Sequence, residues 1–269
     1  MSLPFLRFGF HDFLNAQPLL VPLTRIASQI GLEIILDPPA VIAAKLKAGQ
    51  VDLGMIPSVE YLKQADRYRL FPGLAIASRG RVGTVILVTK NPLNETQTLA
   101  LDNRSMTSIA LLQVLFKNKL PPQIKFHHSD PDLNTMLKTS DAALIIGDQA
   151  LKAGEQFPEC TLYDLSEEWF KRTGKTFVHA VIAIRPCIGI GQEILDQVMH
   201  LDYEKAIPEI VQSWAGKSGI SRAECEDYLR RKITYRLGEA EMEGLEAFRN
   251  QCLDLGLIDQ KHPIRFVEN

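Results

Sequence analysis

The sequence has few of the features that mark metal, disulfide-linked or membrane proteins. Its 269 residues include four cysteines, which are widely spaced and form no CxxC pair: Cys160, Cys187, Cys225 and Cys252. We therefore expect reduced, mostly buried thiols rather than a structural zinc site. No metal-binding spacing such as HExxH is present, so no metal ligand is predicted. No apolar run has the length that a membrane span needs.

An excess of charge of one sign is also missing. The formal net charge is -2, and acidic and basic residues are interspersed. This pattern predicts neither a nucleic-acid groove nor a basic membrane face. The first residues, MSLPFLRFGF, contain no basic leader and no apolar core of signal-peptide length. We therefore expect a cytoplasmic protein with a small-molecule partner, acting either as a monomer or as a homodimer.

Apolar runs of strand length alternate with helical stretches in two series. The first series predicts strands at Leu6–Phe10, Glu33–Leu36 and Val51–Ile56. The second predicts strands at Thr98–Leu101, Gln123–His127 and Ala142–Ile146. Long apolar regions at 70–77, 82–89 and 177–184 lie between and after these series, and the chain beyond Gly191 is predicted to be helical throughout.

Two such series joined by long strands indicate two lobes with a ligand cleft between them. We predict an α/β fold in which each lobe is a mixed, mainly parallel sheet flanked by helices. Lobe I would comprise residues 1–89 and 178–269, and lobe II residues 90–177. The alternative is one continuous doubly wound domain, which would have to accommodate the consecutive strand regions at 70–89.

The turns that follow the predicted strands hold the candidate site, because ligands of open α/β sheets bind beyond the carboxyl ends of the strands. Asn15, after the first strand, can cap the next helix or offer its amide to a ligand. Ser58 can likewise cap a helix or present its hydroxyl to the cleft. Arg79 and Arg81 can pair with a carboxylate or face solvent.

The most polar of these turns runs from Asp102 to Ser108 and places three hydroxyls within four residues, on Ser105, Thr107 and Ser108. A helix cap needs only one of them. We therefore predict an anion site at the start of the following helix, with a merely polar loop as the alternative. In the fourth turn, Gly147 allows either a close backbone approach or a tight turn, and Asp148 is suited to capping a helix.

Six segments, in order along the chain, resemble one known family. The residues FLNAQPL at 13–19 resemble its YLNxxPL, GQVDLGMIPSVEY at 49–61 its GxxDxxxxPSxEY, and IASRGRV at 76–82 its ISSxGxV. SMTS at 105–108 resembles SxTS, LIIGDQAL at 144–151 resembles LxIGDxAL, and the stretch 164–178 resembles DLxxxWxxxTGxPFV. The family is chorismate dehydratase, of the futalosine route to menaquinone, and the resemblance spans residues 7–185.

The resemblance implies a fold like that of type II periplasmic binding proteins and the dehydration of chorismate to 3-[(1-carboxyvinyl)oxy]benzoate, with no metal or organic cofactor. It implies that Asn15 is the catalytic-site asparagine. An amide does not titrate near neutral pH, so Asn15 would orient the substrate or bind the leaving hydroxyl, while a substrate carboxylate, or else Asp148, takes the proton. The predicted substrate-binding residues are Ser58, Ser78, Ser105, Met106, Thr107, Ser108, Gly147 and Asp148.

Three alternatives remain open at this point. The sibling enzyme, 1,4-dihydroxy-6-naphthoate synthase, shares the fold but usually opens with a Cys-Pro-Asn-Asp-type segment and uses a histidine base. A solute-binding protein of a transporter would need an export signal. A cytosolic effector-sensing domain, which binds a small anion without catalysis, would normally accompany a DNA-binding helix-turn-helix.

Overall fold

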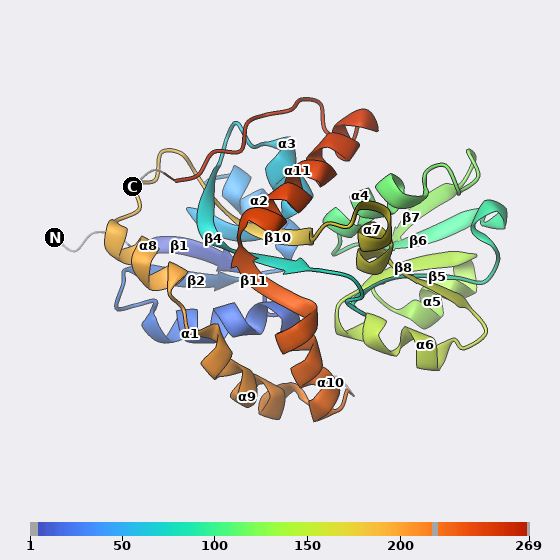
Figure 1. Ribbon diagram of the computed structural model, residues 1–269, viewed down its shortest axis with the longest axis horizontal. Coiled ribbons are helices and arrows are strands. Elements are labelled where there is room, and N and C mark those ends of the chain that lie inside the picture. The colour runs from blue at the N-terminus through green and yellow to red at the C-terminus, as the bar shows by residue number, and fades with distance from the viewer. Residues whose placement is uncertain (1–4, 217–219, 268–269) are drawn as a thin grey trace.

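The computed structural model describes residues 5–216 and 220–267, which form two lobes along the long axis of the molecule (Figure 1). One lobe is built on a six-stranded sheet of order β11-β4-β10-β3-β1-β2, and the other on a five-stranded sheet of order β7-β6-β8-β5-β9. The strands are β1 Leu6–Phe10, β2 Leu32–Leu36, β3 Leu53–Pro57, β4 Arg69–Ser78, β5 Val85–Thr89, β6 Thr98–Asp102, β7 Lys125–Ser129, β8 Ala142–Ile146, β9 Thr161–Asp164, β10 Phe177–Ile184 and β11 Ile233–Leu237.

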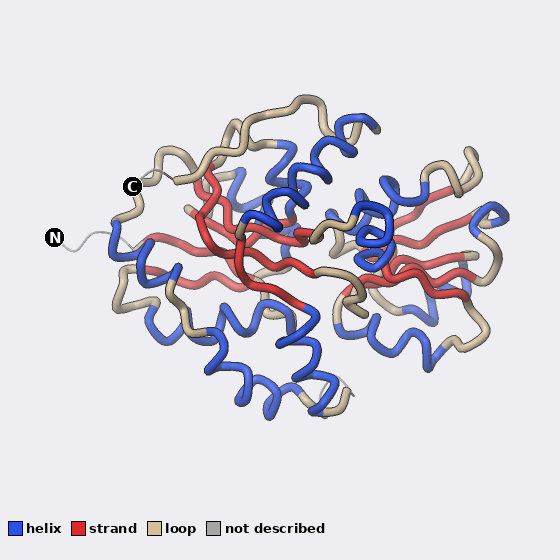
Figure 2. The backbone as a smooth tube through the Cα atoms, viewed as in Figure 1, coloured by secondary structure: helices blue, strands red, loops and turns tan. Residues whose placement is uncertain are grey.

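Helices lie above and below the strands of the first sheet (Figure 2). In the second lobe α4 and α7 pack on one face of the sheet, and α5 and α6 on the other. The helices are α1 Gln17–Ile26, α2 Pro39–Lys47, α3 Ser58–Lys63, α4 Thr107–Phe116, α5 Leu133–Thr139, α6 Ala153–Gln156, α7 Leu165–Thr173, α8 Gln192–Met199, α9 Tyr203–Trp214, α10 Arg222–Asp227 and α11 Glu239–Asp254. Shorter turns are the 3-10 helices η1 Leu14–Ala16, η2 Leu93–Glu95 and η3 Asp148–Lys152, and the π-helical η4 Tyr228–Lys232. In the described part of the chain, no helix is both long and apolar enough to cross a bilayer.

The predicted α/β fold with two mixed sheets flanked by helices is confirmed. Strands β1, β2 and β3 pair in parallel, as do β6, β7 and β8. In the first sheet β10 is antiparallel to β3 and β4, and in the second sheet β5 is antiparallel to β8 and β9. Every residue of β3 and β5 is buried, which explains why both read as continuous apolar runs.

The prediction that residues 1–89 belong to the first lobe is wrong for Val85–Thr89, because β5 lies in the second sheet. The chain leaves the first sheet earlier, in the turn after β4. Gly80 and Gly83 both adopt a positive φ there, which turns the backbone toward the second lobe. One carboxylate oxygen of Asp164 accepts hydrogen bonds from the Val82 and Gly83 N–H groups, at 2.9 and 2.6 Å, and so holds the crossing in place.

The prediction that everything after Gly191 is helical is also wrong, because β11 lies there. This strand pairs antiparallel with β4 at the edge of the first sheet. Its buried residues, Ile233, Tyr235 and Leu237, alternate with more exposed ones, which is the period of a strand with one buried face. The strand is only five residues long and adjoins helical patterns on both sides, so the helical periodicity of its neighbours dominates the sequence pattern there.

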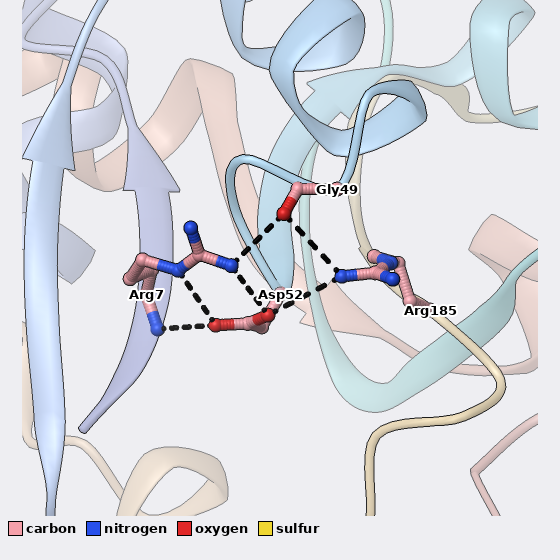
Figure 3. Close-up of polar contacts among 4 residues, drawn as sticks. All are labelled: Arg7, Gly49, Asp52 and Arg185. Atoms are coloured by element: carbon pink, nitrogen blue, oxygen red, sulfur yellow. Dashed lines mark hydrogen bonds and ion pairs between the residues drawn. The ribbon is translucent and has the colours of Figure 1, made fainter. Parts of the chain in front are cut away.

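A cluster of charged groups at the far end of the first sheet explains the segment GQVD at 49–52 (Figure 3). Asp52 accepts hydrogen bonds from the backbone N–H, Nε and Nη2 of Arg7, and Arg185 Nη1 lies 3.5 Å from its Oδ1. Both guanidinium groups also donate to the Gly49 carbonyl. Gly49 has a φ of +73°, and a Cβ there would lie 3.2 Å from Arg185. This part of the motif therefore joins β1, β3 and β10 and does not reach the ligand site.

Candidate functional site

A cavity lies between the two sheets, at the turns that follow their strands; we call it the inter-sheet cavity. From the first lobe, its lining includes Asn15 after β1, Pro57 at the end of β3 and His179 in β10. From the second lobe, it includes the turn at 104–108 after β6 and Gly147 after β8. The four polar turns expected to build the site therefore meet in one place, as the rule for open α/β sheets requires.

Six of the nine predicted site residues line the inter-sheet cavity, and three do not. Those that line it are Asn15, Ser105, Met106, Thr107, Ser108 and Gly147. Ser58, Ser78 and Asp148 lie outside the lining, and each makes hydrogen bonds within the protein.

Asn15 sits in η1, the turn that leads into α1. Neither η1 nor α1 has a side-chain cap at its start, so Asn15 does not serve as a helix cap. Its Oδ1 is buried and has no hydrogen-bond partner among the described residues. A buried amide oxygen without a partner is costly, so the cavity side of Asn15 is suited to a ligand that supplies a donor.

The start of α4 forms the second-lobe wall. Met106 occupies the N-cap position of this ten-residue helix, and its side chain makes no capping hydrogen bond to the first N–H groups. Thr107 instead connects the lobes: its Oγ1 donates to the His179 carbonyl at 3.2 Å and lies 3.4 Å from the Val59 N–H. An uncapped helix start with its partial positive charge is a suitable place for a carboxylate.

The three predicted residues outside the cavity position others or face elsewhere. Ser58 is fully buried and donates to the Val178 carbonyl at 2.7 Å, which ties the start of α3 to β10. Ser78 Oγ lies 2.8 Å from His179 Nε2 and 2.9 Å from Ser166 Oγ. Ser78 therefore supports a cavity residue without lining the cavity itself.

Asp148 faces away from the inter-sheet cavity. Its Oδ2 accepts a hydrogen bond from Trp214 Nε1 at 2.9 Å, and burial raises the pKa of this carboxyl. The predicted alternative in which Asp148 takes the substrate proton therefore has no support from this geometry. The other candidate cations of the sequence, Arg79 and Arg81, are exposed, and Arg79 stacks on the ring of Phe170.

Sequence reasoning missed Arg104 as a site residue, although it stands in the most polar turn. Its Nε and Nη2 form a two-pronged pair with the fully buried carboxylate of Asp102, at 2.9 and 2.7 Å. The guanidinium lies over the ring of Phe13, from the other lobe, at 5.5 Å. Among the described residues its Nη1 has no partner, so it can donate to a ligand carboxylate.

Two histidines, His11 and His179, also line the inter-sheet cavity. Burial lowers the pKa of both His11 and His179 to about 4. Both are therefore uncharged near neutral pH and are weak bases. Within the described part of the chain, the titratable side chains in the cavity lining are these two and Arg104, and no cluster of His, Cys, Asp and Glu suited to a metal ion occurs there.

Comparisons with known proteins bear on this geometry. Residues 6–254 match the family described as menaquinone biosynthesis. The chain is 30% identical over 236 residues to a chorismate dehydratase of Thermus thermophilus, a match that covers 81% of this chain and 86% of that protein.

Solved structures share the fold at low sequence identity. A protein of Archaeoglobus fulgidus matches with a TM-score of 0.73 at 16% identity, over 94% of this chain and 98% of that one. The alkanesulfonate-binding protein of Xanthomonas axonopodis pv. citri, bound to MOPS, gives 0.65 at 16% identity over 97% and 96%. A Candida albicans protein with the generic periplasmic binding protein fold gives 0.67 at 11% identity over 97% and 92%. The expectation of a periplasmic-binding-protein-like fold is confirmed.

Proposed function

Because the chain belongs to the menaquinone biosynthesis family, we propose that it is a chorismate dehydratase whose reaction takes place in the inter-sheet cavity. One observation supports this location above the others. The uncapped start of α4, Arg104 and Asn15, whose buried Oδ1 has no partner among the described residues, all line a single cavity between the lobes. Groups of this kind suit a small molecule that carries both carboxylates and a hydroxyl.

Chorismate is a dianion, and the second lobe offers donors for its carboxylates. Asp102 holds the Arg104 guanidinium in one orientation beside the cavity, so binding a ligand carboxylate there costs little side-chain entropy. The backbone N–H groups at the start of α4 supply further donors beside the hydroxyls of Ser105 and Ser108. We assign the carboxylates to this wall and the ring hydroxyl to the wall that carries Asn15.

Dehydration removes the hydrogen from C3 of the ring and the hydroxyl from C4, and the new C3–C4 double bond completes an aromatic ring. The C3–H electron pair forms the π bond, and the C4–O electron pair leaves with oxygen, which takes up the proton as water. The described lining contains no carboxylate of the protein, and its two histidines are weak bases. We therefore assign the transfer of the proton from C3 to the leaving oxygen to a carboxylate of the substrate.

Mixing the protein with chorismate and recording a new aromatic absorbance tests the activity. The Asn15→Ala variant should lose roughly 100-fold in kcat, the loss expected when the reacting group is no longer held in position. Because Asn15 caps no helix, its replacement should leave Tm unchanged. Asn91→Ala, an exposed position in the turn after β5, is the matched control and should behave as the wild type.

The proposal fails if the wild-type protein binds chorismate without forming product, since that outcome describes a sensor or a transport protein. It also fails in part if Asn15→Ala retains turnover near that of the wild type. In that case the reaction would stand and the role of Asn15 in it would not.

A further inference from the structure

A second residue that lines the inter-sheet cavity has a buried polar atom with no role in the mechanism so far. His11 directly follows β1, lines the cavity and is 3% exposed. Its Nδ1 is closed off from solvent and has no hydrogen-bond partner among the described residues. The ring packs between Phe10 and Phe13, with centroids 6.1 and 5.0 Å away. A buried ring nitrogen without a partner destabilises the folded protein, so its retention in a cavity wall points to a ligand.

The chemistry of the two unpartnered atoms indicates which ligand group they suit. Asn15 Oδ1 is an acceptor only, while the Nδ1 of a neutral imidazole is a donor when it carries the ring hydrogen. A carboxylate has no hydrogen to give to Asn15 Oδ1. A hydroxyl can accept one hydrogen bond and donate another, so it satisfies both atoms at once.

We propose that His11 is a further substrate-contacting residue, which together with Asn15 binds the leaving hydroxyl of chorismate. In this arrangement Nδ1–H of His11 donates to the hydroxyl oxygen, and the hydroxyl donates to Oδ1 of Asn15. The inference rests on the proposed function, because chorismate supplies a single hydroxyl and that hydroxyl is the leaving group.

His11 acts here as a neutral hydrogen-bond donor and gives up no proton. Burial holds its pKa at about 4, so the ring is uncharged at neutral pH. The other titratable groups around it are His179 across the cavity, Arg104, whose charge is paired with Asp102, and the exposed neighbour Asp12. As the C4–O bond breaks, negative charge grows on the oxygen and the hydrogen bond from His11 strengthens. The proton that completes the water is the one removed from C3.

The decisive comparison uses the product as a competitive inhibitor, because it keeps both carboxylates and lacks the ring hydroxyl. His11→Phe should lower kcat/KM for chorismate by roughly tenfold or more, the effect of losing one hydrogen bond to a developing charge. The inhibition constant of the product should stay unchanged. The Tm should stay the same or rise, since a phenyl ring fills the same space and leaves no buried nitrogen without a partner.

Two further variants complete the test. His11→Gln restores a side-chain N–H donor and should recover part of the lost kcat/KM, whereas a role in packing alone would be met better by Phe. Asp12→Ala, at the exposed adjacent position, should match the wild type in every parameter. In the wild type, kcat/KM should not fall by a factor of ten per pH unit above about pH 4, as it would if the protonated ring were the acid.

The outcomes separate the inference from the function on which it rests. If His11→Phe weakens product inhibition as much as it lowers kcat/KM, His11 does not bind the hydroxyl and the inference is overturned. The same holds if the substitution lowers Tm while it weakens product inhibition and lowers kcat/KM. If the wild type forms no product from chorismate, the proposed function itself is overturned. If the wild type forms product and His11→Phe is unaltered, the function stands and the role of His11 does not.

Discussion

A single methyl group at Gly244 would test how closely the C-terminal helix packs against the crossing between the lobes. Gly244 lies in the interior of α11, and a Cβ placed there would come within 1.9 Å of the Thr176 carbonyl oxygen and 2.9 Å of its carbon. Thr176 directly precedes β10, and the same carbonyl accepts a hydrogen bond from Trp169 Nε1 at 3.3 Å. The α11 helix and the return crossing therefore fit together only while residue 244 has no side chain.

Two opposing contributions decide whether Gly244→Ala raises or lowers the free energy of unfolding. Replacing Gly by Ala inside a helix ordinarily stabilises it by about 1 kcal/mol. Overpacking a core ordinarily costs about 1–3 kcal/mol, and the upper part of that range applies because the clashing atoms are backbone and cannot rotate away. We expect Gly244→Ala to lower the free energy of unfolding by about 1–2 kcal/mol, which corresponds to a Tm lower by roughly 2–8 °C.

Urea denaturation of Gly244→Ala beside Gly154→Ala measures this difference with a matched control. Gly154 is also helical, in α6, and a Cβ there would lie 3.6 Å from Leu162 Cδ2, an ordinary contact. That variant should be neutral or more stable than the wild type by up to about 1 kcal/mol. If Gly244→Ala is as stable as the wild type, the close approach of α11 to Thr176 is wrong.

Two other substitutions address the charged clusters. Asp52→Asn should lower the free energy of unfolding at pH 7 by about 1–3 kcal/mol, because Arg7 loses its carboxylate partner. Burial alone would raise the pKa of Asp52, but the hydrogen bonds and charge of Arg7, with the charge of Arg185, lower it overall. The advantage of the wild type is therefore fully present above the unfolded-state pKa of about 3.9, and in denaturant titrations it should shrink as the pH falls from there through the lower folded-state pKa of Asp52. An advantage that does not shrink on acidification below pH ~3.9 would contradict this account. Arg104→Lys keeps the positive charge but loses the planar guanidinium with its paired N–H donors. KM for chorismate and the inhibition constant of the product should therefore rise together, by roughly tenfold each. If neither constant rises, Arg104 does not bind a carboxylate.

The convergence of the four turns on one cavity could be predicted because it depends only on the direction in which the strands run. Each polar turn follows a strand, and parallel strands bring their carboxyl ends to one edge of a sheet. Asn15 and the hydroxyls at 105–108 were found in this way. The same logic predicted the parallel pairing of β1 with β2 and β3 and of β6 with β7 and β8, since alternating strand and helix patterns are what crossover connections require.

What could not be predicted depends on partners that are distant in the sequence. The Ser58 hydroxyl donates a hydrogen bond to the carbonyl of Val178, 120 positions away, and the sequence around Ser58 does not indicate that partner. Asp164 was seen only as part of a motif, although it caps α7 and also holds Val82 and Gly83 at the first crossing. His179 lies in a strand whose pattern reads as apolar, and only the structure shows that its ring borders the cavity. Periodicity assigns a residue to an element but does not say what lies opposite it.

The charges in the inter-sheet cavity suggest how the site binds a dianion without a surplus of basic side chains. Arg104 is neutralised by Asp102, and the low pKa of both histidines keeps them uncharged, so the formal charge of the site is close to zero. Attraction for the carboxylates must then come from oriented N–H donors, above all those at the uncapped start of α4, where the helix dipole places about half a positive charge. Such donors neither titrate nor compete for the proton of the reaction. Because the described lining holds no protein carboxylate, the substrate carboxylates are the anionic bases at this site, which is the property that an internally assisted dehydration needs.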